Sequence, residues 1–558
     1  MTGFSSKAAC GIAIFALAGC GAPSTPTPAP QAKAPPTGQL NRLVERYWDE
    51  HLPTEDVISP QLLADSLSIE RRYLEELLGV SRDSLDAPAR LTYDIFRRRR
   101  EIRIEGFTFP DELLPINPFG GMTQQIAAQA AQLAQHPAAN ASEYDSWLRR
   151  IDDYVRWTQQ ATVNMREGMR RGYTSPRSVI ERMLAILEHL GVDDSANVFY
   201  APLRTMPASL KDSERARLTR DLTRAVGERL LPADRALHDF LQKEYLPRAR
   251  ASIALSELPL GHEWYAFLVK KATSTAVSPD EINRIGAAEV ERLGTVPTAE
   301  TPPAPKTPPA AAIGLVNAYQ ELKVQVQAAL PAAFAEIPKS DLEIQSAEWP
   351  PHPDASLYFE SRPPGVGILF VNTGKGAKAA VSIAGFLRLG LPGEYFQIAL
   401  QQAQSDLPRF RRFGSEAAFT EGWGLYAASL GDTLGLYGDE SAKLDATAAM
   451  RRCAVDLVVD TGLHAKGWTR GQAFDYLRTH LGVDDVDAQS LIDGYAASPA
   501  AALACVGAIK FRALRALAEQ HLGGRFDLRE FHSQILQGGA MPLDILEAKM
   551  KGWMDASK

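Results

Sequence analysis

The sequence predicts a mainly α-helical protein with one small β-sheet. From Leu40 to about Leu293, leucine, isoleucine and valine recur every three or four residues between charged positions, which is the pattern of amphipathic helices. The only convincing strands, Ser356 to Phe359 and Gly365 to Asn372, are short, so any sheet that they form is small. With 558 residues, of which 45% are hydrophobic and 23% charged, the chain can bury a large core.

Local signals mark where individual helices begin. The segment Ser278–Glu281 reads Ser-Pro-Asp-Glu, which combines an N-cap, a proline at the first helical position and a carboxylate in the first turn. A helix is therefore expected from this segment to Leu293, and another around residues 315–330. Helices return from Ala379 to the end of the chain, with a second capping signal at Thr469–Gln472.

We expect the chain to comprise five segments within one mostly helical body. They are a signal peptide at 1–19, a lipidated cysteine with a proline-rich tether at 20–39, a helical N-terminal half at 40–294, a proline-rich linker or loop at 295–311, and a C-terminal half at 312–558. The two proline-rich segments cannot pack a core, because they contain little besides proline and small or polar residues.

The first twenty residues look like a bacterial lipoprotein signal. Lys7 precedes an apolar run from Ala8 to Ala18, which is too short to span roughly 30 Å of hydrocarbon, and Cys20 follows a Leu-Ala-Gly cleavage site. We expect lipidation at Cys20, with an ordinary signal peptide or a buried helix as the alternative. The expected location is the bacterial cell envelope, lipid-anchored and facing the periplasm, and Gly21 after the anchor favours the outer membrane.

The charge balance argues against nucleic acid as a partner. The chain has 60 Lys+Arg and 67 Asp+Glu, a formal charge of −7, so it lacks the basic excess that grips a phosphate backbone. One basic run, Arg97 to Arg100, could bind phosphate, since clustered guanidinium groups do so well. Four consecutive helical positions point in all directions, however, and Glu101 and Glu105 follow, so a solvated helix with salt bridges is the favoured interpretation.

Cysteine usage leaves two thiols in the mature body. Cys10 is lost with the signal and Cys20 is lipidated, so Cys453 and Cys505 remain. They could pair, since the compartment beyond the anchor is oxidising. Both lie in apolar segments with a helical pattern, and buried free thiols are the favoured interpretation.

The common enzyme motifs are absent from the sequence. It contains no G-x-S-x-G elbow, P-loop, Rossmann glycine fingerprint or H-E-x-x-H. His262-Glu263 begins like a zincin helix, but Ala266 and Phe267 stand where the second histidine would have to be. We treat that pair as a coincidence.

Several ordered motifs resemble the bacterial family called domain of unknown function 885, from about residue 40 to the C-terminus. They are Tyr245-Leu-Pro-Arg-Ala-Arg250, Trp264-Tyr265, the capped helix from Ser278, Val371-Asn372-Thr373, Glu421-Gly422-Trp423, Asp460-Thr-Gly-Leu-His464 with Gly467-Trp468, and Phe526-Asp527 through Phe531-His532 to Pro542-Leu543. Members of that family are often envelope lipoproteins and look like zinc metallopeptidases. The resemblance therefore implies a zincin-like, more narrowly gluzincin-like, helical architecture for the C-terminal half.

The same resemblance implies a zinc site, which looks degenerate here. The family pattern is H-E-x-x-P-G-H-x-x-Q followed by E-G-W on the next helix, in which two imidazoles and a carboxylate hold Zn²⁺ and a glutamate activates water. The corresponding positions are Arg388, Leu389, Glu394, Gln397 and Glu421. Arginine has no lone pair to donate and leucine cannot accept a proton, so we expect no zinc and no other cofactor.

One carboxylate of that pattern, Glu421, is expected on a helix capped by Ser415, on a different face from an apolar stripe. The stripe comprises Phe419, Trp423, Tyr426 and Leu430. We hypothesise that the guanidinium of Arg388 replaces the metal cation and pairs with Glu421, with Glu394 as a further partner. In the alternative, Arg388 points to solvent and Glu421 bonds a backbone group.

Two histidines, His464 and His532, match positions that relatives retain, which makes them candidates for polar site chemistry. Asp460 precedes His464 by four residues on a helix, so its carboxylate could orient the ring. A structural histidine with satisfied hydrogen bonds is the more common case and is the favoured alternative.

The favoured functional interpretation is an envelope lipoprotein that binds a peptide, cell-wall fragment or envelope protein and does not hydrolyse it. One alternative is an active hydrolase that uses Glu421 or Glu394 with another metal, or His464 or His532. Another is a structural or assembly lipoprotein of the envelope. Partners other than the membrane, which the N-terminal lipid contacts, are not specified by the sequence.

Overall fold

The computed structural model describes most of the chain. The described residues are 36–50, 58–135, 137–138, 140–294, 309–347, 357–362, 366–373, 381–438 and 440–557. The predicted signal peptide, Cys20 and most of the tether lie outside them, as do residues 295–308 of the second proline-rich stretch. Within the described ranges the chain is mainly helical with one small sheet, which confirms that prediction. No helix in these ranges is both long and apolar enough to cross a bilayer.

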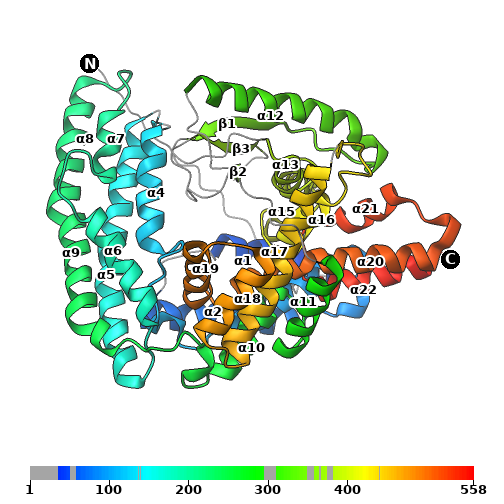
Figure 1. Cartoon of the computed structure of the whole chain (residues 1–558), viewed down its shortest axis with the longest axis horizontal. Helices are drawn as coiled ribbons and strands as arrows, with labels where there is room; N and C mark the ends of the chain where they lie inside the picture. Colours follow the sequence, from blue (N-terminus) through cyan, green and yellow to red (C-terminus); the bar gives the residue numbers. More distant parts are fainter. Residues whose placement is uncertain are drawn as a thin grey trace, which may run out of the picture.

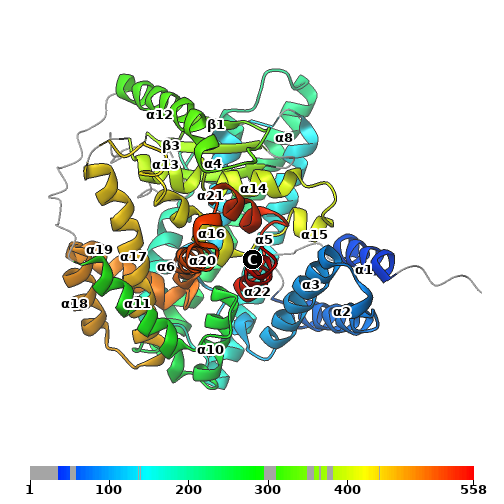
Figure 2. The ribbon, with the colours of Figure 1, turned by 90° about the vertical axis from the view of Figure 1, so that its right-hand side faces the viewer.

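Three helices follow the predicted tether and lie together at one side of the molecule (Figure 2). They are α1 (Pro36–Glu50), α2 (Pro60–Leu78) and α3 (Ala87–Gly106). Helix α1 begins at Pro36, so the last residues of the predicted tether are helical. The three helices pack through edge-to-face aromatic contacts of Tyr47 with Tyr73 and with Phe96.

A second group of helices forms the wall at the left of Figure 1. It contains α4 (Met122–Gln135), α5 (Ala141–Arg171), α6 (Arg177–Leu190), α7 (Ala201–Arg204), α8 (Asp212–Ala225) and α9 (Leu231–Phe240). Turns of π-helix, Val226–Leu230 and Leu241–Tyr245, follow α8 and α9. These helices enclose a hydrophobic core of their own, which includes Trp147, Tyr154 and Leu222.

The remaining helices follow α9 along the chain. They are α10 (Gly261–Thr273), α11 (Pro279–Leu293), α12 (Pro309–Ala329), α13 (Ile383–Leu389), α14 (Glu394–Ala403), α15 (Arg409–Arg412), α16 (Ala417–Ala428), α17 (Glu440–Ala465), α18 (Arg470–Leu481), α19 (Asp485–Ala497), α20 (Val506–Leu522), α21 (Leu528–Leu536) and α22 (Leu543–Ala556). Helices α18 and α19 pack with part of α17 around a separate core, and the others share the main hydrophobic core with α1 to α3. The main core runs from Leu40 to Met554.

The capping signals position two of these helices as expected. The Ser278 hydroxyl accepts the Glu281 amide at the start of α11. Thr469 and Gln472 form a reciprocal capping box at the start of α18. Both signals act over three residues, which is why the sequence alone locates them.

The sheet has three strands in the order β1-β3-β2. They are β1 (Leu342–Ala347), β2 (Leu357–Arg362) and β3 (Val366–Asn372), with β1 parallel and β2 antiparallel to β3. The sequence predicted the two later strands within a few residues but missed β1. In β3, Leu369 and Val371 join the main core, whereas Ile368 and Phe370 pack with Ala347, as alternation along a strand requires.

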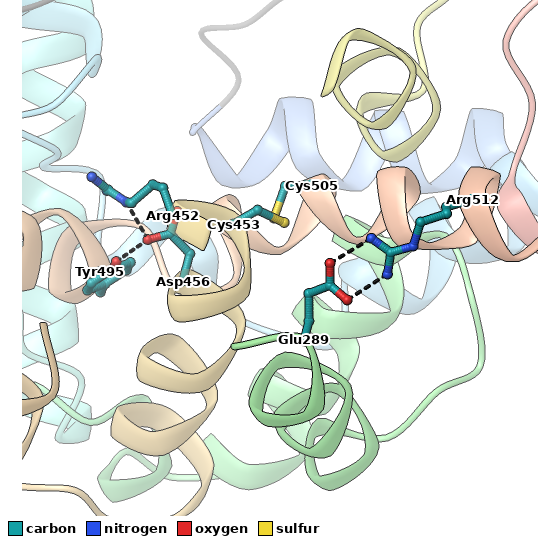
Figure 3. Close-up of a disulfide and its surroundings, with 7 residues drawn as sticks. All are labelled: Glu289, Arg452, Cys453, Asp456, Tyr495, Cys505 and Arg512. Carbon is teal, nitrogen blue, oxygen red and sulfur yellow. Dashed lines mark hydrogen bonds and ion pairs between the residues drawn. A yellow bond between two sulfur atoms is a disulfide. The ribbon is translucent and has the colours of Figure 1, made fainter. Parts of the chain in front are cut away.

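The prediction of free thiols is wrong, because Cys453 and Cys505 form a disulfide (Figure 3). Cys453 lies on α17 and Cys505 ends the 3₁₀ helix Ala501–Cys505, and their Cα atoms are 5.8 Å apart. That spacing lies within the range that a disulfide can bridge. The sequence shows two apolar helical segments but not that they are neighbours in the fold.

The prediction for the basic run is wrong in part. Arg97 is exposed and pairs with Glu101, as expected for a solvated helix. Arg100, by contrast, is buried, with its Nε 2.6 Å from Glu70 and its guanidinium 3.8 Å above the Tyr47 ring. The partners come from α2 and α1, so the local pattern of α3 could not reveal them.

Candidate functional site

The turn between α13 and α14 brings Arg388 and Glu394 together. A methyl group at Gly393 would lie 1.8 Å from the carbonyl oxygen of Arg388, so only glycine fits this close approach. The turn folds the first residue of α14 back over the last turn of α13. Arg388 Nε consequently lies 4.0 Å from Glu394 Oε1, at the limit of an ion pair.

Helix α16 supplies the third residue, Glu421. A methyl group at Gly424 would lie 2.9 Å from Cγ of Glu394, so the Glu394 side chain rests directly on α16, one turn after Glu421. The Trp423 indole donates a hydrogen bond to the Pro392 carbonyl at 2.9 Å and fixes the turn to this helix. Three segments that are separate in sequence therefore converge on one polar cluster, which we call the Arg388 cluster: Arg388, Glu394 and Glu421.

Helix α16 begins differently from the expectation. Its N-cap is Glu416, whose carbonyl accepts the amide of Thr420, and no side chain caps it. Ser415 is one residue too early, and its carbonyl accepts a hydrogen bond from Arg99. The predicted apolar stripe is buried as expected, and Glu421 is only partly buried.

Burial and charge oppose one another in the Arg388 cluster. Burial raises the pKa of Glu394 to about 7, the Arg388 guanidinium lowers this pKa, and the Glu421 charge raises it. Burial also raises the pKa of Glu421, against the same guanidinium. The Arg388 side chain is 40% exposed and that of Glu394 is 16% exposed, so the cluster reaches solvent at Arg388. Within the described residues the ion pair is with Glu394, and Glu421 interacts with the guanidinium through its charge alone.

A second polar group lies on α17 and α19 (Figure 3), and the charge of Arg388 acts on its carboxylate, Asp456. Asp456 Oδ1 accepts hydrogen bonds from Arg452 Nε at 2.6 Å and from the Tyr495 hydroxyl. Burial raises the pKa of Asp456, while Arg452 and then Arg388 lower it. Sequence reasoning missed these residues. The available signal was the pair of opposite charges four residues apart, Arg452 and Asp456, within an apolar helix.

The other residues of the degenerate pattern have structural contacts. Gln397 Nε2 donates to Gln401 Oε1 at 2.7 Å, and the Thr420 hydroxyl donates to Gln397 Oε1 at 3.0 Å. Gln397 therefore belongs to a buried amide network that joins α14 to α16. Leu389 packs against the main core, as its apolar side chain favours.

Both candidate histidines are fully buried and use both ring nitrogens for protein contacts. His464 Nδ1 accepts the Leu255 amide and Nε2 contacts the Tyr495 carbonyl, each at 3.0 Å. Burial lowers the His464 pKa to about 3, so the ring is neutral. Asp460 does not orient it, because this carboxylate accepts the Tyr265 hydroxyl at 2.6 Å and the Ala500 amide.

The ring of His532 has an equivalent environment. Its Nδ1 lies 2.8 Å from the Ala333 carbonyl and its Nε2 lies 2.9 Å from the Tyr426 hydroxyl. The ring stacks on Phe334, and burial lowers its pKa to about 4. These contacts support the structural alternative for both histidines and leave no ring nitrogen for a substrate.

The donor set of the Arg388 cluster does not fit zinc. A structural or catalytic zinc site of this kind needs imidazole and carboxylate lone pairs around one point. Here a permanently charged guanidinium lies at ion-pair distance from one of two carboxylates. Across the ranges that the structure describes, no group of three or more His, Cys, Asp or Glu residues is arranged to hold a metal ion.

A large cavity lies between α6, α18 and α19. Its volume is about 1000 Å³, and it is bounded by α6, by the segment before the 3₁₀ helix Leu255–Glu257, and by α18 and α19. The charged residues that line it are Arg177, Arg182, Arg470, Glu181, Glu257 and Asp493, and Trp468 adds an aromatic face. On α19, the Tyr495 hydroxyl bonds Asp456 and the Tyr495 carbonyl contacts His464.

The fold matches two solved structures over nearly the whole chain. Each is described as that of a "putative lipoprotein". The one from Colwellia psychrerythraea has a TM-score of 0.79 and 22% identity, and the match covers 93% of this chain and 100% of that one. The one from Shewanella oneidensis, of unknown function, has a TM-score of 0.59 and 16% identity, with 92% and 99% covered. At these identities the likeness shows a shared fold.

A comparison with the curated proteins finds no match. The comparison with family models does find a match, to the same family that the sequence motifs resemble. The model of the family described as "Bacterial protein of unknown function (DUF885)" matches residues 47–550, and the chain belongs to this family.

Proposed function

We propose that this protein is a lipid-anchored component of the bacterial envelope that binds a peptide ligand and does not hydrolyse it. The observation that carries the proposal is the ion-pair contact of Arg388 with Glu394, at the two positions where the family pattern has zinc-binding histidines. A guanidinium there supplies a cation that can neither ligate nor polarise a metal-bound water. The body is then a zincin-like metallopeptidase fold whose catalytic site has become a structural ion pair.

The loss of hydrolysis follows from three changes in the same turn. Arg388 and Glu394 remove both imidazole ligands, and Leu389 removes the group that would take a proton from water. Leu389 instead packs against the core. A single conservative substitution could not restore the chemistry.

Binding is assigned to the cavity between α6, α18 and α19. A volume of about 1000 Å³ accommodates a short peptide, and charges of both signs suit its amino and carboxylate groups. Trp468 offers apolar surface within the same lining. Arg177 and Glu257 are charged, exposed residues of this lining, which makes them suitable for substitution.

Three observations support the envelope location. The N-terminal sequence ends in Leu-Ala-Gly-Cys20. Both structural neighbours are described as lipoproteins. The disulfide between Cys453 and Cys505 suits an oxidising compartment.

The catalytic half of the proposal is tested by metal content and cleavage. The full-length chain is purified in detergent without chelator and without a histidine tag, and its metals are measured by mass spectrometry. It is then incubated with a mixed-sequence hexapeptide library, with and without added Zn²⁺, and the peptides are analysed. We expect no near-stoichiometric zinc and no cleavage. Stoichiometric zinc or peptide cleavage that disappears in Glu421→Ala would show that the chain is a metallopeptidase.

The binding half is tested by calorimetry with the same hexapeptide library and with a peptidoglycan stem peptide. We expect saturable binding that weakens at least tenfold in Arg177→Ala/Glu257→Ala. The matched control is Arg156→Ala, which removes an exposed arginine of α5 that pairs with neighbouring Asp153. Binding that is absent, or that the control weakens equally, would contradict the assignment to the cavity.

One observation favours a second candidate function, a metal-independent hydrolase. Glu394 has a pKa of about 7 and lies next to Glu421, and a pair of adjacent carboxyls with shifted pKa values can divide acid and base roles. This candidate predicts cleavage that survives chelation and is lost in both Glu394→Gln and Glu421→Gln. The library experiment distinguishes it from the binding proposal.

A further inference from the structure

A basic cavity lies where α3 meets α10, and it shares no lining residue with the Arg388 cluster or with the larger cavity. Its volume is about 370 Å³. Six cationic side chains line it, namely Arg98, Arg99, Arg100, Arg103, Lys270 and Lys271. Ser415 and Glu416, just before α16, and Pro542, just before α22, complete part of the lining, so the positive ends of two helices lie beside it.

Carboxylates balance only some of this charge. Ion pairs join the cluster to four of them, namely Glu70, Glu105, Glu416 and Asp544. In the described part of the chain, six cations face four ion-paired carboxylates, so positive charge is in excess here on a chain whose net charge is −7. Lys271 is exposed and has no ion pair in the described part of the chain. It does interact electrostatically with Asp111, a carboxyl whose pKa burial raises.

Among the described residues, two guanidinium groups of this cavity each have a buried nitrogen without a hydrogen-bond acceptor. Arg98 Nε is buried, and its nearest carboxylate, that of Asp544, is 3.5 Å away without forming a hydrogen bond. Arg100 Nη1 is also buried without a partner, on a side chain that is 5% exposed. Buried polar nitrogens are nearly always paired in folded proteins. An anionic ligand in the cavity would supply acceptors where the protein does not.

The arginines are held in place before any ligand arrives. Arg99 donates to Glu416 at 2.8 Å and to the carbonyls of Phe410 and Ser415. Arg100 lies flat over the Tyr47 ring and pairs with Glu70. Fixed guanidinium forks lose little side-chain entropy on binding, which favours planar, multidentate recognition of oxyanions.

We propose that this cavity binds a phosphate group, and that a dianionic phosphomonoester is its best ligand. The excess of cationic over ion-paired carboxylate side chains suits such a dianion, and the oxygens of phosphate match guanidinium donors. The cavity volume is in the range of small-molecule sites, so it accommodates the group that carries the phosphate as well. The carrier is either a soluble phosphate ester or a lipid with a phosphomonoester headgroup. The proposal does not depend on the peptide site, because it uses none of the same residues.

The test is calorimetric titration of the full-length chain in neutral detergent with inorganic phosphate and with glycerol 3-phosphate. We expect saturable binding that weakens at least tenfold in Arg98→Gln/Lys271→Gln. The control is Arg97→Gln, one position earlier on α3, which removes an exposed arginine that pairs with Glu101 and does not line the cavity. The phosphate affinity of this control should stay within twofold of that of the unmodified chain. If the double variant does not fold, Lys271→Gln alone replaces it, with an expected weakening of about threefold.

Vesicles separate the two sources of the phosphate. Phosphatidylcholine vesicles measure insertion of the lipid anchor alone, and vesicles that also contain phosphatidic acid add the phosphomonoester headgroup. Stronger retention on the second kind, lost in the double variant, supports a lipid source. Binding of glycerol 3-phosphate without that preference supports a soluble one. No saturable phosphate binding, or equal weakening in Arg97→Gln, overturns the proposal.

Discussion

Arg388 Nε lies 4.0 Å from Glu394 Oε1, across a turn that only glycine at position 393 permits. The contact joins a half-exposed cation to a mostly buried carboxyl whose pKa is about 7. At neutral pH the carboxyl is therefore balanced between its charged and neutral forms. The charge of Arg388 is the main influence that favours the charged form.

Replacement of Arg388 should consequently change the titration of Glu394 more than it changes stability. In Arg388→Ala we expect the Glu394 pKa to rise further above 7, because the group that lowers it is gone. The free energy of unfolding should fall by only about 1 kcal/mol, since solvent screens an arginine that is 40% exposed. NMR of labelled glutamate carboxyls measures the pKa of Glu394, and urea unfolding measures the free energy of unfolding. If neither changes relative to Arg156→Ala, the pairing has no energetic consequence.

The raised pKa of Glu394 also predicts how stability depends on pH. Its usual pKa is 4.5 and its folded value is about 7, so between these values the folded state holds more protons than the unfolded state. This group therefore stabilises the fold below pH 4.5, and its contribution declines as the pH rises through 7.

Glu394→Gln should remove that decline. The difference in unfolding free energy between the unmodified chain and the variant should change by on the order of 3 kcal/mol between about pH 4.5 and about pH 8. Urea unfolding at steps of pH measures it. Glu321→Gln, at an exposed site on α12, serves as the control and should leave the profile unchanged. A profile for Glu394→Gln that parallels the unmodified chain would contradict the shifted pKa.

Features encoded within a few residues were predictable from the sequence. The caps at Ser278 and Thr469 act over three positions, and both helices begin where expected. Strand β1 was missed because its partner, β3, lies more than twenty residues later and the pairing is parallel. The burial of Arg100 was missed for the same kind of reason, since Glu70 and Tyr47 come from other helices.

The candidate site likewise has features that the sequence predicts and features that it does not. The Pro-Gly turn is local, so the proximity of Arg388 and Glu394 follows from their spacing around it. The hydrogen bond from Tyr495 to Asp456 joins α19 to α17, and no local sequence pattern predicts it. Asp460 and His464 show the limit of spacing arguments. They are four residues apart on one helix, yet each bonds to a different element.

The disulfide should contribute strongly to stability. It closes a segment with a sequence separation of 52 residues, for which loss of chain entropy in the unfolded state corresponds to about 4 kcal/mol. Reduction, or Cys505→Ser, should lower the urea midpoint accordingly, and thiol labelling should find no free cysteine in the native body before reduction. In Cys453→Ser/Cys505→Ser, added reductant should have no further effect. Free thiols in the oxidised, folded protein would rule out the bond.

His464 provides a prediction for acid conditions. Its folded pKa is about 3 and its usual value is 6.5, so between these values the unfolded state binds more protons and stability falls as the pH falls from 6.5 towards 3. The slope from this one group is about 1.4 kcal/mol per pH unit.

In His464→Gln that slope should disappear. The variant should also be about 1 to 3 kcal/mol less stable at pH 7, because an amide cannot reproduce both the Leu255 and the Tyr495 contacts. His262→Gln, at an exposed position, should change neither quantity. Equal acid sensitivity of His464→Gln and the unmodified chain would mean that the ring is solvated and free to titrate, and would return it to the set of candidate catalytic groups.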